Sequence, residues 1–146
     1  ELKDQNIKVI AIGEKNDSML KHDQIIQFGY VKDKMILKEL YTLADAFILP
    51  SMAENFPNTI VESLLCGTPV IASNVGGIPE QITKENGLLV NLMDVEDWKQ
   101  KLTWFIENKQ KFDREAIKQK AKKDYNNEMI VEQHIKLYKQ LLKKQA

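Results

Sequence analysis

The chain has 146 residues and equal numbers of basic and acidic side chains, 21 of each, so its formal net charge is zero. This length fits one domain with a sizeable core, and the neutral balance gives no reason to expect nucleic acid as a partner. The single cysteine, Cys66, excludes an internal disulfide and fits a reducing compartment. No apolar run approaches the length of a membrane span.

Short apolar runs alternate with longer amphipathic stretches along the chain. This is the pattern of β/α units around a parallel sheet, and the β-branched runs are typical of strands covered on both faces. We therefore expect an α/β fold with a doubly wound parallel sheet and a helical C-terminal extension. The predicted strands are 7–12, 25–28, 46–49, 70–72 and 88–90, and the predicted helices are 34–43, 57–66, 95–107, 114–123 and 128–142.

The C-terminal third is helical and rich in lysine. Arg114 is the only arginine and lies among charged residues, so we expect it to be a solvated surface residue. The last predicted helix carries an apolar stripe that includes Ile130, Ile135 and Tyr138. Such a helix either packs its apolar side on a core or lies on a membrane surface, and we expect the first.

Residues 51–80 are the most informative segment. Pro57 fits the first turn of a helix, where a missing N–H costs nothing. The free backbone N–H groups of Asn58, Thr59 and Ile60 would then point out of the helix end. Together with the helix dipole they predict a site for a phosphate anion.

Two carboxylates flank this helix start. Glu62 shares a helix face with Asn58 and Thr59, one turn behind the phosphate, where it could accept hydrogen bonds from ribose hydroxyls. Glu54 lies on the preceding loop and could reach a sugar beyond the phosphate. A glycosidase also uses paired carboxylates, but it would need no helix end prepared for phosphate.

These residues resemble a known family. Glu54 and Glu62 form a Glu-x7-Glu pair, followed by Cys-Gly-Thr-Pro-Val-Ile-Ala-Ser at 66–73 and Gly-Gly-Ile-Pro-Glu at 76–80. With the segments 28–30, 44–51 and 86–90, which match in order and spacing, the chain resembles the retaining GT-B glycosyltransferases of family 4. The resemblance covers roughly residues 7–140.

The resemblance implies that residues 1–146 form the C-terminal, nucleotide-sugar-binding domain of a longer protein. The first strand–helix unit of that domain, with the arginine and lysine that hold the diphosphate, would precede Glu1, as would the acceptor domain. The intact enzyme would transfer a hexose from a UDP- or GDP-sugar to a saccharide or lipid-linked acceptor with retention, in surface polysaccharide or glycolipid synthesis. We expect the fragment alone to fold but to be inactive.

The resemblance also assigns site residues. Glu54 would contact the donor sugar near the reacting carbon, and Tyr30 and Val31 would lie against the nucleobase. Gly76 and Gly77 would allow close backbone approach to the donor, with an ordinary tight turn as the alternative. Many members have Gly-Phe-Gly where this chain has Asn55-Phe56-Pro57. The resemblance assigns sugar contacts to Asn55 and Phe56, with asparagine in place of the first glycine. The donor-binding residues are Glu62, Asn58, Thr59, Ile60, Asn55, Phe56, Tyr30, Val31, Gly76 and Gly77.

No Asp-x-Asp motif and no cluster of cysteine and histidine occurs in the sequence. We therefore expect no metal and no cofactor, with the helix end and the preceding basic pair neutralising the leaving nucleotide. The expected location is cytoplasmic, with peripheral association at the inner face of the membrane left open. Two alternatives also remain open: a sugar-nucleotide epimerase of the same fold, and a non-catalytic nucleotide-sugar-binding module.

Overall fold

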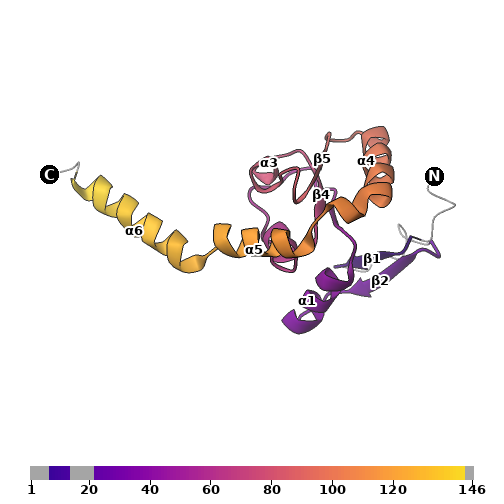
Figure 1. The fold of residues 1–146 in the computed structure, drawn as a ribbon, viewed down its shortest axis with the longest axis horizontal. Coiled ribbons are helices and arrows are strands. Elements are labelled where there is room, and N and C mark those ends of the chain that lie inside the picture. Colours follow the sequence, from indigo (N-terminus) through magenta and orange to yellow (C-terminus); the bar gives the residue numbers. More distant parts are fainter. Residues whose placement is uncertain (1–6, 14–21, 144–146) are drawn as a thin grey trace.

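The computed structural model describes residues 7–13 and 22–143, and its strands form two parallel sheets. In the first sheet β1 (Val9–Ile12) pairs with β2 (Ile25–Gly29). In the second, β4 (Val70–Ser73) lies between β3 (Phe47–Leu49) and β5 (Gly87–Val90). Figure 1 shows β1 and β2 on one side of the molecule, with α1, and the second sheet with α3, α4 and α5 beside it.

A helix follows each of the strands β2, β3, β4 and β5, and aspartates cap three of the helices. The side chains of Asp33, Asp94 and Asp113 accept hydrogen bonds from backbone N–H groups in the first turns of α1, α4 and α5, which satisfies donors that have no partner within the helix. The helices are α1 (Lys34–Leu43), α2 (Asn58–Leu65), α3 (Ile78–Gln81), α4 (Val95–Asn108), α5 (Arg114–Asp124) and α6 (Asn127–Lys143), with a 3-10 turn at Lys109–Lys111.

The α/β fold with parallel strands is confirmed, and every predicted element is present with bounds that differ by two residues at most. The described strands form two parallel sheets rather than one. In a doubly wound sheet with strand order 3-2-1-4-5-6, the central strand joins two flanks. The pairs β2–β1 and β3–β4–β5 match those flanks, and no described strand lies between β1 and β3.

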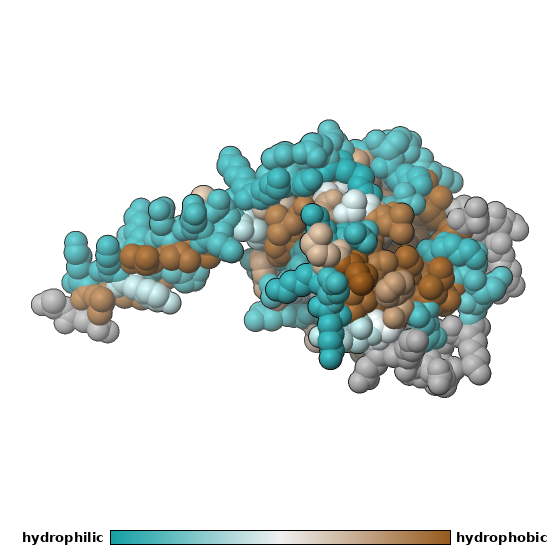
Figure 2. All heavy atoms as spheres, turned by 90° about the horizontal axis from the view of Figure 1, so that it is seen from below, coloured by the Kyte–Doolittle hydropathy of each residue, from teal (hydrophilic) through white to brown (hydrophobic). Residues whose placement is uncertain are grey.

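The core surrounds β4, the middle strand of the second sheet, whose residues are all buried. Ile60 and Leu64 of α2 pack on it, and each such side chain stabilises the fold by about 1.5–3 kcal/mol. Apolar side chains also reach the surface on the face where α1, β1 and β2 lie (Figure 2). The buried core residues are Ile60, Leu64, Val70, Ile71, Ala72, Ile78, Ile82, Val90, Phe105, Phe112, Ile117 and Ala121.

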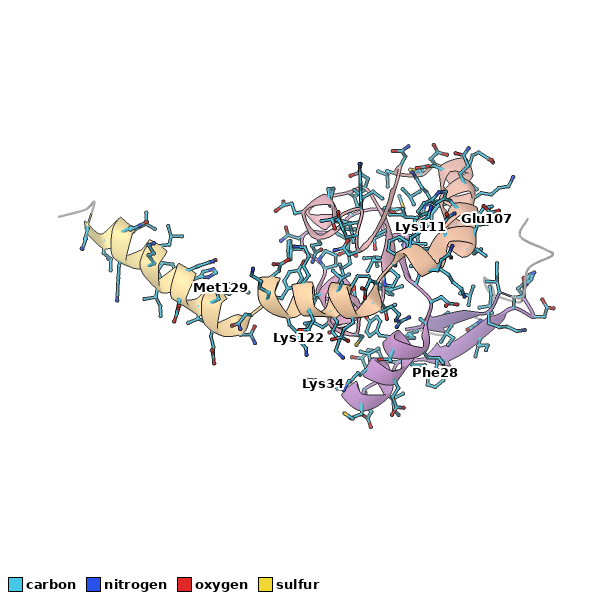
Figure 3. All side chains as sticks on the ribbon, in the orientation of Figure 1. Phe28, Lys34, Glu107, Lys111, Lys122 and Met129 are labelled. Atoms are coloured by element: carbon cyan, nitrogen blue, oxygen red, sulfur yellow. The ribbon has the colours of Figure 1, made fainter. Side chains whose placement is uncertain are left out.

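The last helix, α6, extends away from the rest of the molecule (Figure 1). None of its described side chains is buried, and an apolar row runs along it between polar residues (Figure 2). In Figure 3, Lys122 of α5 and Met129 of α6 mark the two sides of the joint between these helices. The expectation that this helix faces the core is wrong, because it lies beyond the sheets. Among the described helices, none has both the length and the apolar character needed to cross a membrane.

Arg114 corrects a second expectation, since it is half-buried rather than solvated. Its Nη1 donates to the carbonyl of Ala44 at 2.7 Å, and its Nη2 donates to the carbonyl of Thr42 and to Thr68 Oγ1, both at 2.8 Å. A rigid, planar guanidinium holds its donors in fixed directions toward several acceptors, whereas an ammonium is a point charge on a flexible stem. Arg114 thus supplies donors to carbonyls at the C-terminal end of α1, which lack partners within that helix.

The turn after α2 brings α5 against that helix. The N–H groups of Gly67 and Thr68 donate to the carbonyls of Leu64 and Ser63 at 2.9 and 3.0 Å. With Gly67 at φ +76°, this is a Schellman end. A Cβ at Gly67 would collide with the backbone carbonyl of Arg114. The missing side chain therefore lets the start of α5 lie directly on the turn.

Replacing Arg114 with alanine should lower the free energy of unfolding by about 2–3 kcal/mol, because hydrogen bonds to a charged group contribute about 1.5–3 kcal/mol. Urea unfolding measures this change. The control is Lys122→Ala, an exposed position on the same helix, for which we expect a change below about 0.5 kcal/mol. Equal changes in the two variants would show that the three hydrogen bonds of Arg114 add nothing.

Candidate functional site

Two loops meet at the carboxyl edge of the second sheet. Residues 50–57 follow β3, and residues 74–77 follow β4. Because β3 and β4 are adjacent and parallel, both loops leave the sheet at the edge where open α/β sheets bind ligands. The N–H of Gly77 donates to the carbonyl of Asn55 at 2.7 Å and joins them. The fold therefore brings Glu54, Asn55, Phe56, Gly76 and Gly77 together.

The glycine pair makes this contact possible. A Cβ at Gly76 would collide with the carbonyl of Glu54, and one at Gly77 would collide with the carbonyl of Asn55 and lie 3.2 Å from the ring of Phe56. Gly76 also has φ +53°, where side chains are strained. The close approach that both glycines allow is made to the Glu54 loop, so packing alone accounts for them. Their contact with a donor stays a prediction.

Glu54 is held by a residue that the sequence analysis did not assign. Ser51 Oγ donates to Glu54 Oε1 at 2.7 Å, and the glutamate is half-buried. The hydroxyl thus fixes one oxygen of the carboxylate. The Ser-x-x-Glu spacing could have predicted this hydrogen bond, because residues three apart on a short turn come within hydrogen-bonding range.

The start of α2 differs in one detail from its prediction. Pro57 is the residue that caps the helix rather than its first residue. Among the described residues, no acceptor is found for the N–H of Asn58 or of Thr59, whereas the N–H of Ile60 donates to the Pro57 carbonyl at 3.3 Å. Asn58 and Thr59 are exposed, and Ile60 is fully buried. Two backbone donors, rather than three, are therefore free at this helix end to meet an anion.

Glu62 lies exposed one turn further along α2. The Tyr41 hydroxyl donates to Glu62 Oε2 at 3.3 Å. Burial raises the pKa of Tyr41 above its ordinary value, and the nearby Glu62 charge raises this pKa further. Sequence reasoning missed Tyr41, because an aromatic residue on an amphipathic helix is read as a core residue.

Tyr30 and Val31 follow the carboxyl end of β2. Tyr30 is 77% exposed. Within the described residues, the structure shows no hydrogen bond that links Tyr30 or Val31 to the loops around Glu54. In the described part of the chain, no group of three or more His, Cys, Asp or Glu side chains is arranged to hold a metal ion.

Two carboxylates, two free backbone donors and a glycine turn thus share the carboxyl edge of a parallel sheet, where this architecture binds nucleotides. The sequence profile of the family described as "Glycosyl transferases group 1" matches residues 1–124. The chain belongs to this family.

Individual relatives support this membership. The chain is 39% identical over 77 residues to D-inositol 3-phosphate glycosyltransferase of Saccharomonospora viridis, a match that covers 52% of this chain and 18% of that enzyme. Sucrose-phosphate synthase of Thermosynechococcus elongatus has a similar structure, with a TM-score of 0.72, 30% identity, and coverage of 84% of this chain and 31% of that one. The chain thus spans less than a third of the length of either protein.

The fold extends to more distant proteins. The Anabaena protein HepE, solved in complex with UDP, is 20% identical, with a TM-score of 0.76 over 92% of this chain and 41% of that chain. At this identity the likeness concerns the fold alone. It confirms the expected GT-B architecture for the described residues.

Substituting Gly76 with alanine should destabilise the protein through two effects, the positive φ and the collision with Glu54. Gly13→Ala is the matched control, since Gly13 also has positive φ, at +133°, but its added Cβ would meet nothing within 4 Å. We expect backbone strain alone to cost the control about 1–2 kcal/mol. Overpacking should cost Gly76→Ala about 1–3 kcal/mol more. Urea unfolding compares the two, and equal losses would contradict the close packing of the two loops.

Proposed function

We propose that the whole protein is a retaining glycosyltransferase that transfers a hexose from a UDP- or GDP-sugar to an acceptor, and that residues 1–146 form its donor-binding domain. The observation that carries the proposal is the joining of the Glu54 loop to the glycine turn, beside the free helix end of α2. Membership in the group 1 family supports it. UDP bound to HepE, a protein of the same fold, is consistent with a nucleoside diphosphate as the donor.

Each part of the site has a role in this proposal. The N–H groups of Asn58 and Thr59 meet the diphosphate, and Glu62 accepts hydrogen bonds from the ribose. Glu54, Asn55 and Phe56 lie toward the transferred sugar, with Glu54 near the reacting carbon. The chemistry is electrostatic: the enzyme stabilises a sugar cation and a departing diphosphate, and no nucleophile of this chain is invoked.

The remaining residues of the proposed donor site have two further roles. Tyr30 and Val31 read the nucleobase, while Gly76, Gly77 and the buried Ile60 shape the backbone around the sugar and phosphate. The donor site needs no metal or cofactor in this proposal.

The rest of the whole protein completes the site. A further strand–helix unit fits between β1 and β3, each of which has an unpaired edge among the described strands, and it brings the arginine and lysine for the diphosphate. A second domain binds the acceptor, a saccharide or a lipid-linked saccharide of surface polysaccharide or glycolipid synthesis. Residues 1–146 alone are therefore inactive. The reaction takes place in the cytoplasm, at the inner face of the membrane when the acceptor is lipid-linked.

Glu62→Ala in the full-length protein should weaken binding of both the donor and the free nucleoside diphosphate by about 1.5–3 kcal/mol, the usual value of a hydrogen bond to a charged group. Calorimetric titration with UDP and GDP measures the change. Glu39→Ala, an exposed glutamate on α1, serves as the control and should leave both affinities unchanged. If Glu62→Ala also leaves both unchanged, the ribose assignment is wrong.

Glu54→Gln should behave differently, because Glu54 is assigned to the sugar and not to the nucleotide. We expect turnover to fall about a hundred- to a thousandfold, as when one electrostatic stabiliser is lost, while the affinity for free nucleoside diphosphate stays nearly the same. Rates of nucleotide release with and without acceptor measure turnover and separate transfer from hydrolysis. An equal loss of affinity and turnover would indicate a folding defect instead of a role at the sugar.

A further inference from the structure

Tyr41 and Glu62 form a contact between two helices that the proposed function does not explain. Tyr41 belongs to α1 and is 7% exposed, whereas Glu62 belongs to α2 and is exposed. The Tyr41 hydroxyl donates to Glu62 Oε2 at 3.3 Å. Among the described residues, no donor is found for the other carboxylate oxygen, Oε1. The hydroxyl of a buried tyrosine therefore holds one oxygen of a surface carboxylate and leaves the other oxygen open.

Tyr41 is itself fixed on several sides. Its backbone carbonyl accepts a hydrogen bond from Thr68 Oγ1 at 2.6 Å. Its ring packs edge-on against Phe47 of β3, with 5.4 Å between ring centroids and an interplanar angle of 81°. Arg114 binds the same Thr68 hydroxyl and the carbonyl of Thr42, the residue after Tyr41. The backbone and the ring of Tyr41 are thus both held, which limits the positions that its hydroxyl can take.

An exposed glutamate would otherwise sample many rotamers, and ordering it on ligand binding would cost side-chain entropy. The Tyr41 hydroxyl removes part of this cost before the ligand arrives. Because burial and the nearby carboxylate both raise the pKa of Tyr41, the phenol keeps its proton and remains a donor throughout the physiological pH range. At 3.3 Å the contact is longer than an ordinary hydroxyl–oxygen hydrogen bond, so we expect its effect at the lower end of the range for one hydrogen bond.

We propose that Tyr41 is the positioning residue for Glu62: its hydroxyl holds Oε2 so that Oε1 faces the vicinal hydroxyls of the ribose of a nucleoside diphosphate. This inference rests on the proposed function, because it requires Glu62 to bind ribose. It adds a residue from α1 that acts through Glu62 and does not touch the donor.

The test uses the full-length protein and two probes, the ribonucleoside diphosphate that binds, UDP or GDP, and its 2′,3′-dideoxy analogue. Tyr41→Phe removes only the hydroxyl, and Tyr138→Phe on α6 is the matched control. We expect Tyr41→Phe to weaken binding of the ribonucleotide about two- to threefold, the lower end of the range for one hydrogen bond, and to leave binding of the dideoxy analogue unchanged. In a Glu62→Ala background, Tyr41→Phe should have no further effect. Tyr138→Phe should change neither affinity.

The outcomes separate the two proposals. Two outcomes would show that Tyr41 is not the positioning residue. In the first, Glu62→Ala weakens binding of the ribonucleotide but Tyr41→Phe does not. In the second, Tyr41→Phe weakens binding of both probes equally. If Glu62→Ala affects neither probe, the ribose assignment fails first and the Tyr41 proposal fails with it. The ratio of the affinity for the ribonucleotide to the affinity for the dideoxy analogue does not depend on the fraction of folded protein, because unfolding lowers both affinities equally. Should Tyr41→Phe fail to fold, a structure of the unaltered protein with UDP or GDP decides, and a Glu62 carboxylate turned away from Tyr41 would overturn the proposal.

Discussion

The hydroxyl of Thr68 joins the parts of the structure on which the candidate site depends. It donates to the carbonyl of Tyr41 at 2.6 Å and accepts from Arg114 Nη2 at 2.8 Å. Thr68 itself is fully buried, in the turn between α2 and β4. Through this one group, α1, α2 and α5 are held in a common arrangement. Since a buried polar group without partners would cost about 1–3 kcal/mol, displacing α1 or α5 would remove a partner of this hydroxyl and destabilise the fold.

The sequence predicted the fold well where local signals agree with the tertiary structure. Alternating apolar runs and amphipathic stretches located every strand and long helix, because doubly covered strands and amphipathic helices have distinct periods. The four residues of α3 were missed, since a single turn has no period to detect. The division of the described strands into two sheets has no local signal, because strand pairing depends on what occupies the space between β1 and β3. The burial of Arg114 was missed because its acceptors lie 46 to 72 positions away.

The sequence predicted the carboxylates of the candidate site better than the hydrogen bonds that hold them. The placement of Glu54 and Glu62 around the start of α2 follows from a proline, a helix period and the spacing of two carboxylates. The hydroxyl groups that donate hydrogen bonds to these carboxylates are harder to predict from such local patterns. Ser51 lies near Glu54 in sequence, so its spacing offered a signal, but Tyr41 is 21 positions from Glu62 and its hydroxyl reaches it only in the folded chain. Local patterns predict which residues carry charge, and packing decides which oxygen of each carboxylate stays free.

The exposed position of α6 has a consequence for how the chain unfolds. No described side chain of α6 is buried, so its 17 residues stay helical mainly through local helix propensity and side-chain pairs. A helix without tertiary packing is only marginally stable in water. Its helix content should therefore melt gradually, without the sharp transition of the core. Both tryptophans, Trp98 and Trp104, lie on α4 beside the core. Circular dichroism and tryptophan fluorescence would then follow different curves. The two-state free energy of unfolding that urea measures would be that of the core, read from the tryptophans, and would not include α6.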